Sequence, residues 1–172
     1  MPTGGRGRHS NDGRQSSSLD SSTMAQITLP GDFKEFLRLL GARGVEYLLV
    51  GGYAVGHHGY PRYTADIDVW VPIDMGNAER LTTVLRDFGF DMPEVNPELF
   101  LRERMIIRMG VPPMRIEITN HIDGVEFPAC YARRVVVEID EVPVNIIALD
   151  DLKVNKRASG RLKDLADLEN LP

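Results

Sequence analysis

Leu48 to Val71, with the sequence LLVGGYAVGHHGYPRYTADIDVWV, is the stretch that decides the fold of this 172-residue chain. Its first apolar run ends in the glycine pair Gly51-Gly52, a pattern typical of a buried strand followed by a tight turn. A short helix from Tyr53 to His57 is expected next, and then a loop. A second strand, from about Ile67 to Val71, completes a strand–turn–helix–strand unit.

Asp66 and Asp68 lie two residues apart at the start of the second strand, so their carboxylates leave the same face of the strand. Two carboxylates held side by side in an apolar setting repel each other and lose hydration, so they need a compensating cation. A hard divalent ion with oxygen ligands, usually Mg²⁺, meets that need. The alternative is a pair of surface aspartates at a strand end, which the flanking Ile67 and Val69 disfavour.

Two further features suit the same chemistry. Gly51 and Gly52 would let backbone amides approach an anion, as a phosphate-binding turn requires. Glu117 alternates with apolar residues in Arg115-Ile116-Glu117-Ile118, and alternation alone favours a solvent-facing strand residue. On a strand beside the two aspartates, however, Glu117 would complete a site for two Mg²⁺ ions or serve as a general base toward an acceptor hydroxyl.

Cationic and polar residues near these carboxylates are candidates for nucleotide binding. Lys156 shares one helical face with Lys153 and Arg157, and the ordinary explanation is a solvated amphipathic helix. If the acidic site holds a nucleoside triphosphate, a lysine on a helix beside the sheet would neutralise its phosphates. Arg62 and Thr64 precede the aspartates closely enough to contact a nucleotide, and a purely structural role fits them equally well.

Composition argues against several other classes of protein. His57 and His58 are adjacent, so their side chains diverge, which favours loop or packing roles over metal binding. Cys130 is the only cysteine, which excludes internal disulfides and cysteine-rich zinc sites. The net charge of −5 does not indicate a protein that coats nucleic acid. A local basic groove stays open, given this cluster of arginines: Arg102, Arg104, Arg108 and Arg115.

Residues 1–23 differ in composition from the rest of the chain. They are rich in Gly, Ser and Arg and almost free of large apolar side chains, so they cannot offset their ordering entropy. They are predicted to be a disordered leader, of vector origin or upstream of a true start at Met24, and residues 24–172 a single domain. No apolar run approaches the roughly 20 residues that span a bilayer, so a cytoplasmic protein without membrane contact is expected.

The remainder of the chain alternates predicted helices and strands, which indicates an α/β (α+β) domain with a mixed sheet flanked by helices. A capping box at Asp32 and Glu35 begins a helix that Gly41 ends, and Asp74 and Gly89 bound another. Residues 91–103 are expected to be irregular. The other expected elements are strands at 45–50, 105–109, 114–119, 135–139 and 142–147, and helices at 127–132, 149–159 and 161–171.

The spacing of these motifs resembles a known family. Gly51-Gly52, 13 residues and then Asp66-Ile67-Asp68 is similar to the signature of the nucleotidyltransferases related to DNA polymerase β. The segment 62–68, RYTADID, is close to the Arg-x-Thr-x-Asp-Ile-Asp form of several bacterial branches, and the tail from Leu152 to Asp167 resembles their ending. The likeness covers most of residues 33–171. It is nearest to small uncharacterised bacterial nucleotidyltransferases, and more distant from abortive-infection toxins and aminoglycoside nucleotidyltransferases.

The resemblance implies a nucleotidyltransferase fold with a C-terminal helical pair and a Mg²⁺-dependent transfer of NMP from ATP or another NTP to a hydroxyl. It makes Asp66, Asp68 and Glu117 ligands of two Mg²⁺ ions, although the family more often has Asp where Glu117 stands. It assigns Lys156 and Asp164 to the nucleotide. The implied acceptor is an RNA 3′ end such as tRNA, or a partner protein in a toxin–antitoxin pair. An antibiotic nucleotidyltransferase and a non-catalytic nucleotide-binding antitoxin or regulatory module are the alternatives.

Overall fold

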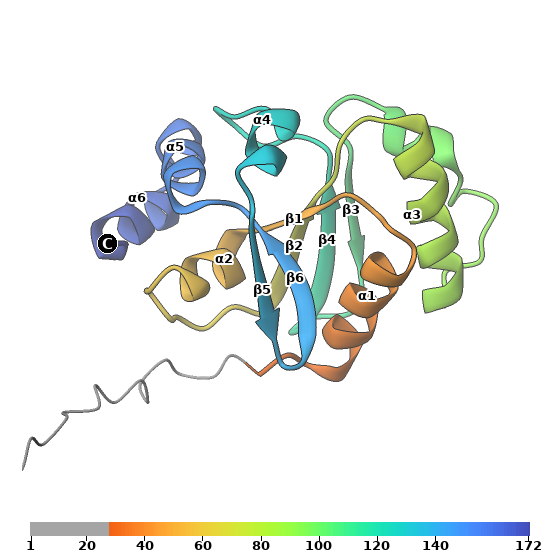
Figure 1. The fold of residues 1–172 in the computed structure, drawn as a ribbon, viewed down its shortest axis with the longest axis horizontal. Coiled ribbons are helices and arrows are strands. Elements are labelled where there is room, and N and C mark those ends of the chain that lie inside the picture. Colours follow the sequence, from red (N-terminus) through yellow and green to blue (C-terminus); the bar gives the residue numbers. More distant parts are fainter. Residues whose placement is uncertain (1–27) are drawn as a thin grey trace, which may run out of the picture.

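The computed structural model describes residues 28–172, which fold around a six-stranded mixed sheet (Figure 1). The order of strands across the sheet is β3-β4-β2-β1-β6-β5. The strands are β1 (Leu48–Val50), β2 (Asp66–Trp70), β3 (Ile106–Met109), β4 (Arg115–Thr119), β5 (Val135–Ile139) and β6 (Val142–Ile146). The predicted mixed α/β architecture is therefore confirmed, whereas the leader predicted at residues 1–23 lies outside the described residues.

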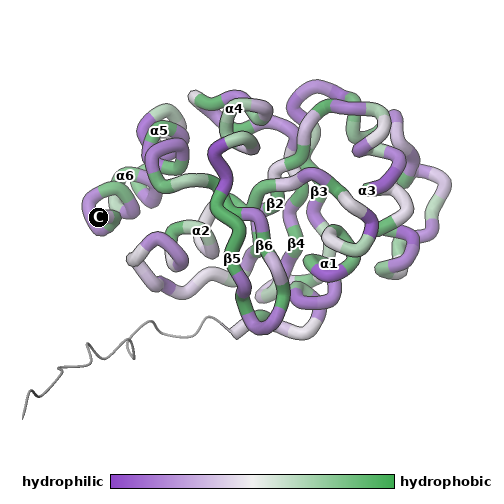
Figure 2. The backbone as a smooth tube through the Cα atoms, viewed as in Figure 1, coloured by the Kyte–Doolittle hydropathy of each residue, from purple (hydrophilic) through white to green (hydrophobic). Residues whose placement is uncertain are grey.

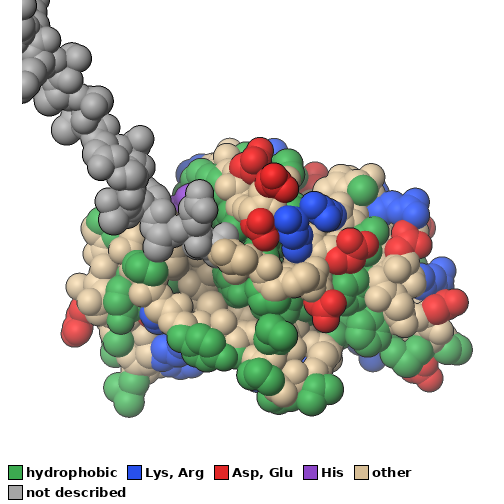
Figure 3. Space-filling model, turned by 90° about the horizontal axis from the view of Figure 1, so that it is seen from below, with side chains coloured by type: hydrophobic (Ala, Val, Ile, Leu, Met, Phe, Trp, Pro, Cys, Tyr) green, Lys and Arg blue, Asp and Glu red, His purple; other side chains and the backbone are tan. Residues whose placement is uncertain are grey.

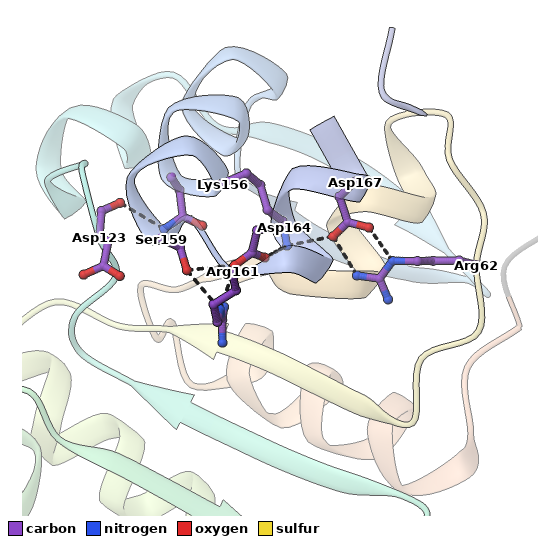
Figure 4. Close-up of polar contacts among 8 residues, drawn as sticks. Arg62, Asp123, Lys156, Ser159, Arg161, Asp164 and Asp167 are labelled. Atoms are coloured by element: carbon purple, nitrogen blue, oxygen red, sulfur yellow. Dashed lines mark hydrogen bonds and ion pairs between the residues drawn. The ribbon is translucent and has the colours of Figure 1, made fainter. Parts of the chain in front are cut away.

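Helices flank this sheet. They are α1 (Gly31–Ala42), α2 (Gly51–His57), α3 (Met75–Phe88), the 3₁₀ helix η1 (Pro97–Leu101), α4 (Phe127–Ala132), α5 (Leu149–Ser159) and α6 (Leu162–Asn170). Helix α1 packs against α3 and β6 through the buried apolar face that the 3.6-residue period predicts. In the close-up of Figure 4, α1 lies on one side of β2 and β4, and α5 and α6 lie on the other.

The pairing of β2 places its two aspartates beside β4. Strand β2 runs antiparallel to β1 on one side and parallel to β4 on the other. In the parallel register Asp68 is the Cα partner of Glu117, and Asp66 is the Cα partner of Arg115. Because side chains alternate along a strand, Asp66, Asp68 and Glu117 all project from one face of the sheet.

The side chains that alternate with these carboxylates point to the other face of the sheet and fill the core. Every residue of β1 is buried, as are Ile67, Val69 and Trp70 of β2. Figure 2 shows hydrophobic stretches along strands such as β5, whereas hydrophobic and hydrophilic residues alternate along the helices. The carboxylates of β2 therefore stand on a strand that burial of its other side chains holds in place.

Two predicted boundaries of α1 are wrong. The helix begins at Gly31, because the amide of Lys34 donates to the carbonyl of Pro30 at 3.0 Å. Asp32 consequently lies in the first turn, where a negative charge faces the favourable end of the helix dipole, and it forms no side-chain cap. The helix also continues past Gly41 to Ala42, and the chain turns at Gly44, whose φ is 65°.

Side-chain amides explain two other departures from the predicted elements. Strand β1 begins at Leu48 rather than Val45, because Asn77 of α3 binds the backbone of Glu46 on both sides, at 2.7 and 3.0 Å. Residues 91–103 contain the 3₁₀ helix η1, which Asn96 caps by accepting a hydrogen bond from the amide of Leu99 at 3.2 Å. The predicted cap of α3 by Asp74 is confirmed, and Gly89 ends that helix with φ 115°.

The surface is uneven in polarity. From below the view of Figure 1, hydrophobic side chains gather on the lower part of the face and charged side chains gather above and to the right (Figure 3). Exposed apolar side chains include Tyr63, Val111 and Leu162. Within residues 28–172, no helix combines the length and the apolar character needed to cross a bilayer.

Candidate active site

A cavity of about 850 Å³ lies between the carboxylate-bearing face of the sheet and the α5–α6 pair. Elements far apart in the sequence form its walls, from the end of β1 to the start of α6. The cavity is lined by all nine residues that the sequence singles out: Gly51, Gly52, Arg62, Thr64, Asp66, Asp68, Glu117, Lys156 and Asp164. The structure thus brings these residues together, and their individual roles stay predictions.

Two of the three carboxylates are engaged by arginines. Arg115 donates from Nε and Nη2 to the two carboxylate oxygens of Asp66, both at 3.2 Å. Arg108 donates from Nε to Oε2 of Glu117 at 2.8 Å. The hydrogen bond with Asp66 raises the pKa of Arg115 above its ordinary value. These arginines stand where a compensating cation is needed.

Asp68 is the third carboxylate, and it differs from the other two. No side chain within residues 28–172 forms an ion pair with it. Burial, and then the charges of Glu117 and Asp66, raise the pKa of Asp68 to about 6, against the opposing influence of Lys163 and then of Lys156. The site therefore holds more negative charge at Asp68 than its surroundings neutralise.

The glycine pair is packed directly against these residues. Gly51 has a φ of 66°, which side chains rarely adopt, and a Cβ there would overlap the carboxylate of Asp68. A Cβ on Gly52 would lie 2.7 Å from Thr64. Thr64 in turn donates from its hydroxyl to the backbone carbonyl of Asp66 at 3.1 Å. Glycine is thus required at both positions, at Gly51 by the close approach of Asp68 in β2 and at Gly52 by that of Thr64 in the preceding loop.

A buried network of charges ties α5 to α6 (Figure 4). Lys156 donates to Asp164 at 2.7 Å and pairs with Asp167 at 2.9 Å. Asp164 also accepts hydrogen bonds of 2.7 Å from Ser159 and from Nε of Arg161. Burial by itself would raise the pKa of Asp164, but these hydrogen bonds outweigh it and lower the pKa to about 2.

Arg62 extends this network to the loop that precedes β2. Its guanidinium donates to both oxygens of Asp167, at 2.7 and 2.9 Å. In this structure Arg62 therefore has the structural contact that the sequence left as one of two interpretations. His58 lies elsewhere and donates from Nε2 to the carbonyl of Ile147 at 2.7 Å, in agreement with a packing role.

Comparison with solved structures gives a match over most of the chain. The chain is similar to a "putative nucleotidyltransferase" from Thermotoga maritima, with a TM-score of 0.51 and 15% sequence identity, over 80% of this chain and 88% of that chain. The fold is nucleotidyltransferase-like. No protein-family model matches the sequence, and neither does any curated protein. At this identity the likeness concerns the fold, and the branch named from the sequence stays a resemblance.

Within this nucleotidyltransferase-like fold, sequence reasoning missed several residues of the site. Asp167 ends the tail that carries the resemblance but was given no role, although it lies three residues after Asp164 and so on the same face of a helix. Arg108 and Arg115 were recognised only as part of a basic cluster, because their partners depend on strand register. Lys163, which also lines the cavity, stands directly before Asp164 in the tail that carries the resemblance, but it was given no role.

The donor set fits the Mg²⁺ that the resemblance implies. Asp66, Asp68 and Glu117 offer the oxygen ligands that this ion prefers, and Asp68 has unneutralised negative charge. Among residues 28–172, however, no three acidic, histidine or cysteine side chains are arranged as a ready-made metal site. In this structure Asp66 is paired with Arg115 and Glu117 with Arg108, so Mg²⁺ would have to compete with guanidinium groups for two of the three carboxylates.

Proposed function

We propose that this chain is a Mg²⁺-dependent nucleotidyltransferase, which binds an NTP in the cavity and transfers NMP to a hydroxyl acceptor. The observation that carries the proposal is the uncompensated carboxylate of Asp68, placed beside Asp66 and Glu117 and against Gly51. Three acidic side chains on one wall of an 850 Å³ cavity have little structural use, because they destabilise one another. A bound cation, itself shared with a polyphosphate, would relieve the repulsion among these carboxylates.

In the proposed reaction the acceptor oxygen attacks the α-phosphorus of the NTP. A new O–P bond forms, the bond from that phosphorus to the bridging oxygen breaks, and pyrophosphate leaves with the electron pair. Asp66, Asp68 and Glu117 would hold Mg²⁺, which supplies charge neutralisation at the phosphates and lowers the pKa of the acceptor hydroxyl. Glu117 is suited to take the hydroxyl proton, since it lies beside Asp68 on the neighbouring strand and its carboxylate lines the cavity.

The charge of the cavity favours an anionic acceptor. Seven cationic and five anionic side chains line it, in a chain whose net charge is −5. Among these cations, Arg104, Arg108 and Arg115 lie on the side of β3 and β4, away from α5 and α6. If Mg²⁺ takes the place of Arg115 and Arg108 beside Asp66 and Glu117, the freed arginines would repel a cationic aminoglycoside and attract an RNA 3′ end such as that of tRNA. The prediction of a toxin–antitoxin partner rests on the resemblance of the sequence alone.

A second candidate function is nucleotide binding without transfer, as in an antitoxin or regulatory module. The specific observation in its favour is the pairing of Asp66 and Glu117 with arginines, at 3.2 and 2.8 Å. If these pairs persist with nucleotide bound, the carboxylates cannot hold two metal ions. The two functions then differ in whether a nucleotide is transferred.

One experiment separates these functions. The protein is incubated with Mg²⁺ and each α-³²P-labelled NTP, together with total RNA, cell protein or aminoglycosides, and the destination of the label is followed. We expect label on RNA or on protein, and a loss of at least about a hundredfold in Asp68→Asn and in Asp66→Asn. Asp91→Asn is the control, since Asp91 is exposed and outside the cavity.

The outcomes discriminate clearly. If Asp68→Asn labels an acceptor as well as the wild-type protein does, the proposed mechanism is refuted. Label on aminoglycosides would replace the anionic acceptor by the antibiotic. Measurable binding of NTP with label on nothing would establish the non-catalytic module instead.

A further inference from the structure

Two kinds of cation occupy the α5–α6 wall of the cavity. Lys156 is of the first kind: its side chain is only 5% exposed, and Asp164 and Asp167 both neutralise it. Arg161 and Lys163 are of the second kind, since both are exposed and line the cavity. The distinction matters because a triphosphate binds most readily to cations that are exposed and not already neutralised by carboxylates.

Lys156 is not available at a low energetic cost. Asp164 and Asp167 are 2% and 1% exposed, so a lysine that turned toward a phosphate would leave buried carboxylates short of a cation. Breaking one side of a buried ion pair is strongly unfavourable. Lys156 therefore holds α5 and α6 together, and its charge is already used.

Lys163 is available. Among residues 28–172, no ion pair engages its ammonium group, in contrast to Lys156 and Arg161 beside it. Of the two lysines, Lys163 also exerts the stronger electrostatic influence on Asp68. An exposed lysine on a cavity wall opposite the acidic cluster is placed to meet a ligand that bridges the two.

Arg161 uses only one of its guanidinium nitrogens, Nε, in the network. Its Nε donates to Asp164 and to Ser159, at 2.7 and 3.0 Å, while its side chain stays 77% exposed. Figure 4 shows the Arg161 side chain extending from the network toward the sheet. The buried carboxylate thus orients a guanidinium whose outer nitrogens face the cavity.

We propose that Lys163, assisted by the outer nitrogens of Arg161, contacts the β- and γ-phosphates of the NTP, and that Lys156 has a structural role only. This inference rests on the proposed function, because it concerns the same nucleotide. Both contacts would be charge-assisted hydrogen bonds, and the flexible lysine is a compact cation suited to a phosphate group. The pyrophosphate that leaves would keep these contacts, so the same cations stabilise the leaving group.

The test is a comparison of triphosphate and monophosphate binding. Calorimetric titrations with Ca²⁺ in place of Mg²⁺ give the Kd of ATP, of AMP and of inorganic tripolyphosphate, and the other three NTPs replace ATP if it does not bind. In Lys163→Ala the Kd of NTP and of tripolyphosphate should rise about tenfold to a hundredfold, while that of NMP stays within about twofold. Lys163→Arg should restore most of the affinity.

Arg157→Ala is the matched control, because Arg157 is an exposed cation of α5 that does not line the cavity. It should leave all three Kd values unchanged. Thermal melts of each variant report folding, and the exposed position of Lys163 leads us to expect an unchanged Tm.

The failure of this inference and of the proposed function are distinguishable. Wild-type affinity for NTP and tripolyphosphate in Lys163→Ala would overturn the role of Lys163 and leave the nucleotidyltransferase proposal intact. An equal loss of NMP affinity would overturn it too, because it would place Lys163 away from the β- and γ-phosphates. If the wild-type protein binds no NTP, the proposed function falls and this inference falls with it.

Discussion

Asp68 is the residue at which the proposed function opposes stability. Its pKa is raised from 3.8 to about 6 by burial and by the neighbouring charges of Glu117 and Asp66. The folded chain thus binds this proton more tightly than the unfolded chain, and stability falls as the pH rises from about 4 through about 6. A shift of about two units corresponds to about 3 kcal/mol, and partial exposure of the side chain reduces the expected effect to about 1–2 kcal/mol.

We therefore expect Asp68→Asn to be more stable than the wild-type protein at pH 7 by about 1–2 kcal/mol in metal-free buffer. Urea unfolding followed by fluorescence measures this, because Trp70 is the only tryptophan and is 2% exposed. At about pH 3.5 the carboxyl group is protonated in most folded and about two-thirds of unfolded chains, so most of the difference should disappear. Added Mg²⁺ should stabilise the wild-type protein and leave Asp68→Asn nearly unaffected.

Asp91→Asn provides the control, since the side chain of Asp91 is 84% exposed and its loss should change stability little. A lower stability of Asp68→Asn at pH 7 would refute the reasoning. So would a stability difference that does not depend on pH, because a pKa of Asp68 that is higher in the folded than in the unfolded chain makes the difference grow as the pH rises.

Three other substitutions test the contacts around this residue. Lys156→Met leaves Asp164 and Asp167 without a buried cation and should lower the free energy of unfolding by about 3–5 kcal/mol, measured with urea; a loss under 1 kcal/mol would contradict the network. Arg115→Gln frees Asp66 and should tighten Mg²⁺ binding about two- to fivefold in calorimetry, and unchanged or weaker binding would argue against competition between the arginine and the ion. Gly51→Ala should cost about 1–3 kcal/mol, whereas Gly41→Ala, with no atom within 4 Å of the added Cβ, should be neutral or stabilising.

The fold followed from the sequence where short-range patterns determine it. Alternation and apolar runs predicted the six strands, and Asp74 and Gly89 marked both ends of α3. The shortening of β1 arises from a contact between distant segments. Asn77 binds the backbone of Glu46 and shortens β1, and no local pattern in residues 45–50 contains that information.

The sequence predicted which residues lie at the candidate site better than it predicted which of them form ion pairs with one another. The spacing of Gly51, Asp66 and Asp68 pointed to a common site, and the structure brings them to one cavity. The choice of cation partners could not be predicted, because it depends on register and burial. Lys156 and Lys163 look alike in a sequence, yet one is buried between two carboxylates and the other is exposed.

The ion pair of Arg62 with Asp167 joins two segments that are synthesised at different times. The acidic strand and its glycine pair leave the ribosome early, whereas Lys156, Lys163 and Asp167 follow about a hundred residues later. When Asp68 has left the ribosome but α6 has not, the carboxylates of β2 lack the lysines of α5 and α6. Arg62 then also lacks its partner Asp167. On the proposed function, such a nascent chain lacks part of its nucleotide site, and we expect activity only once α6 has emerged and docked.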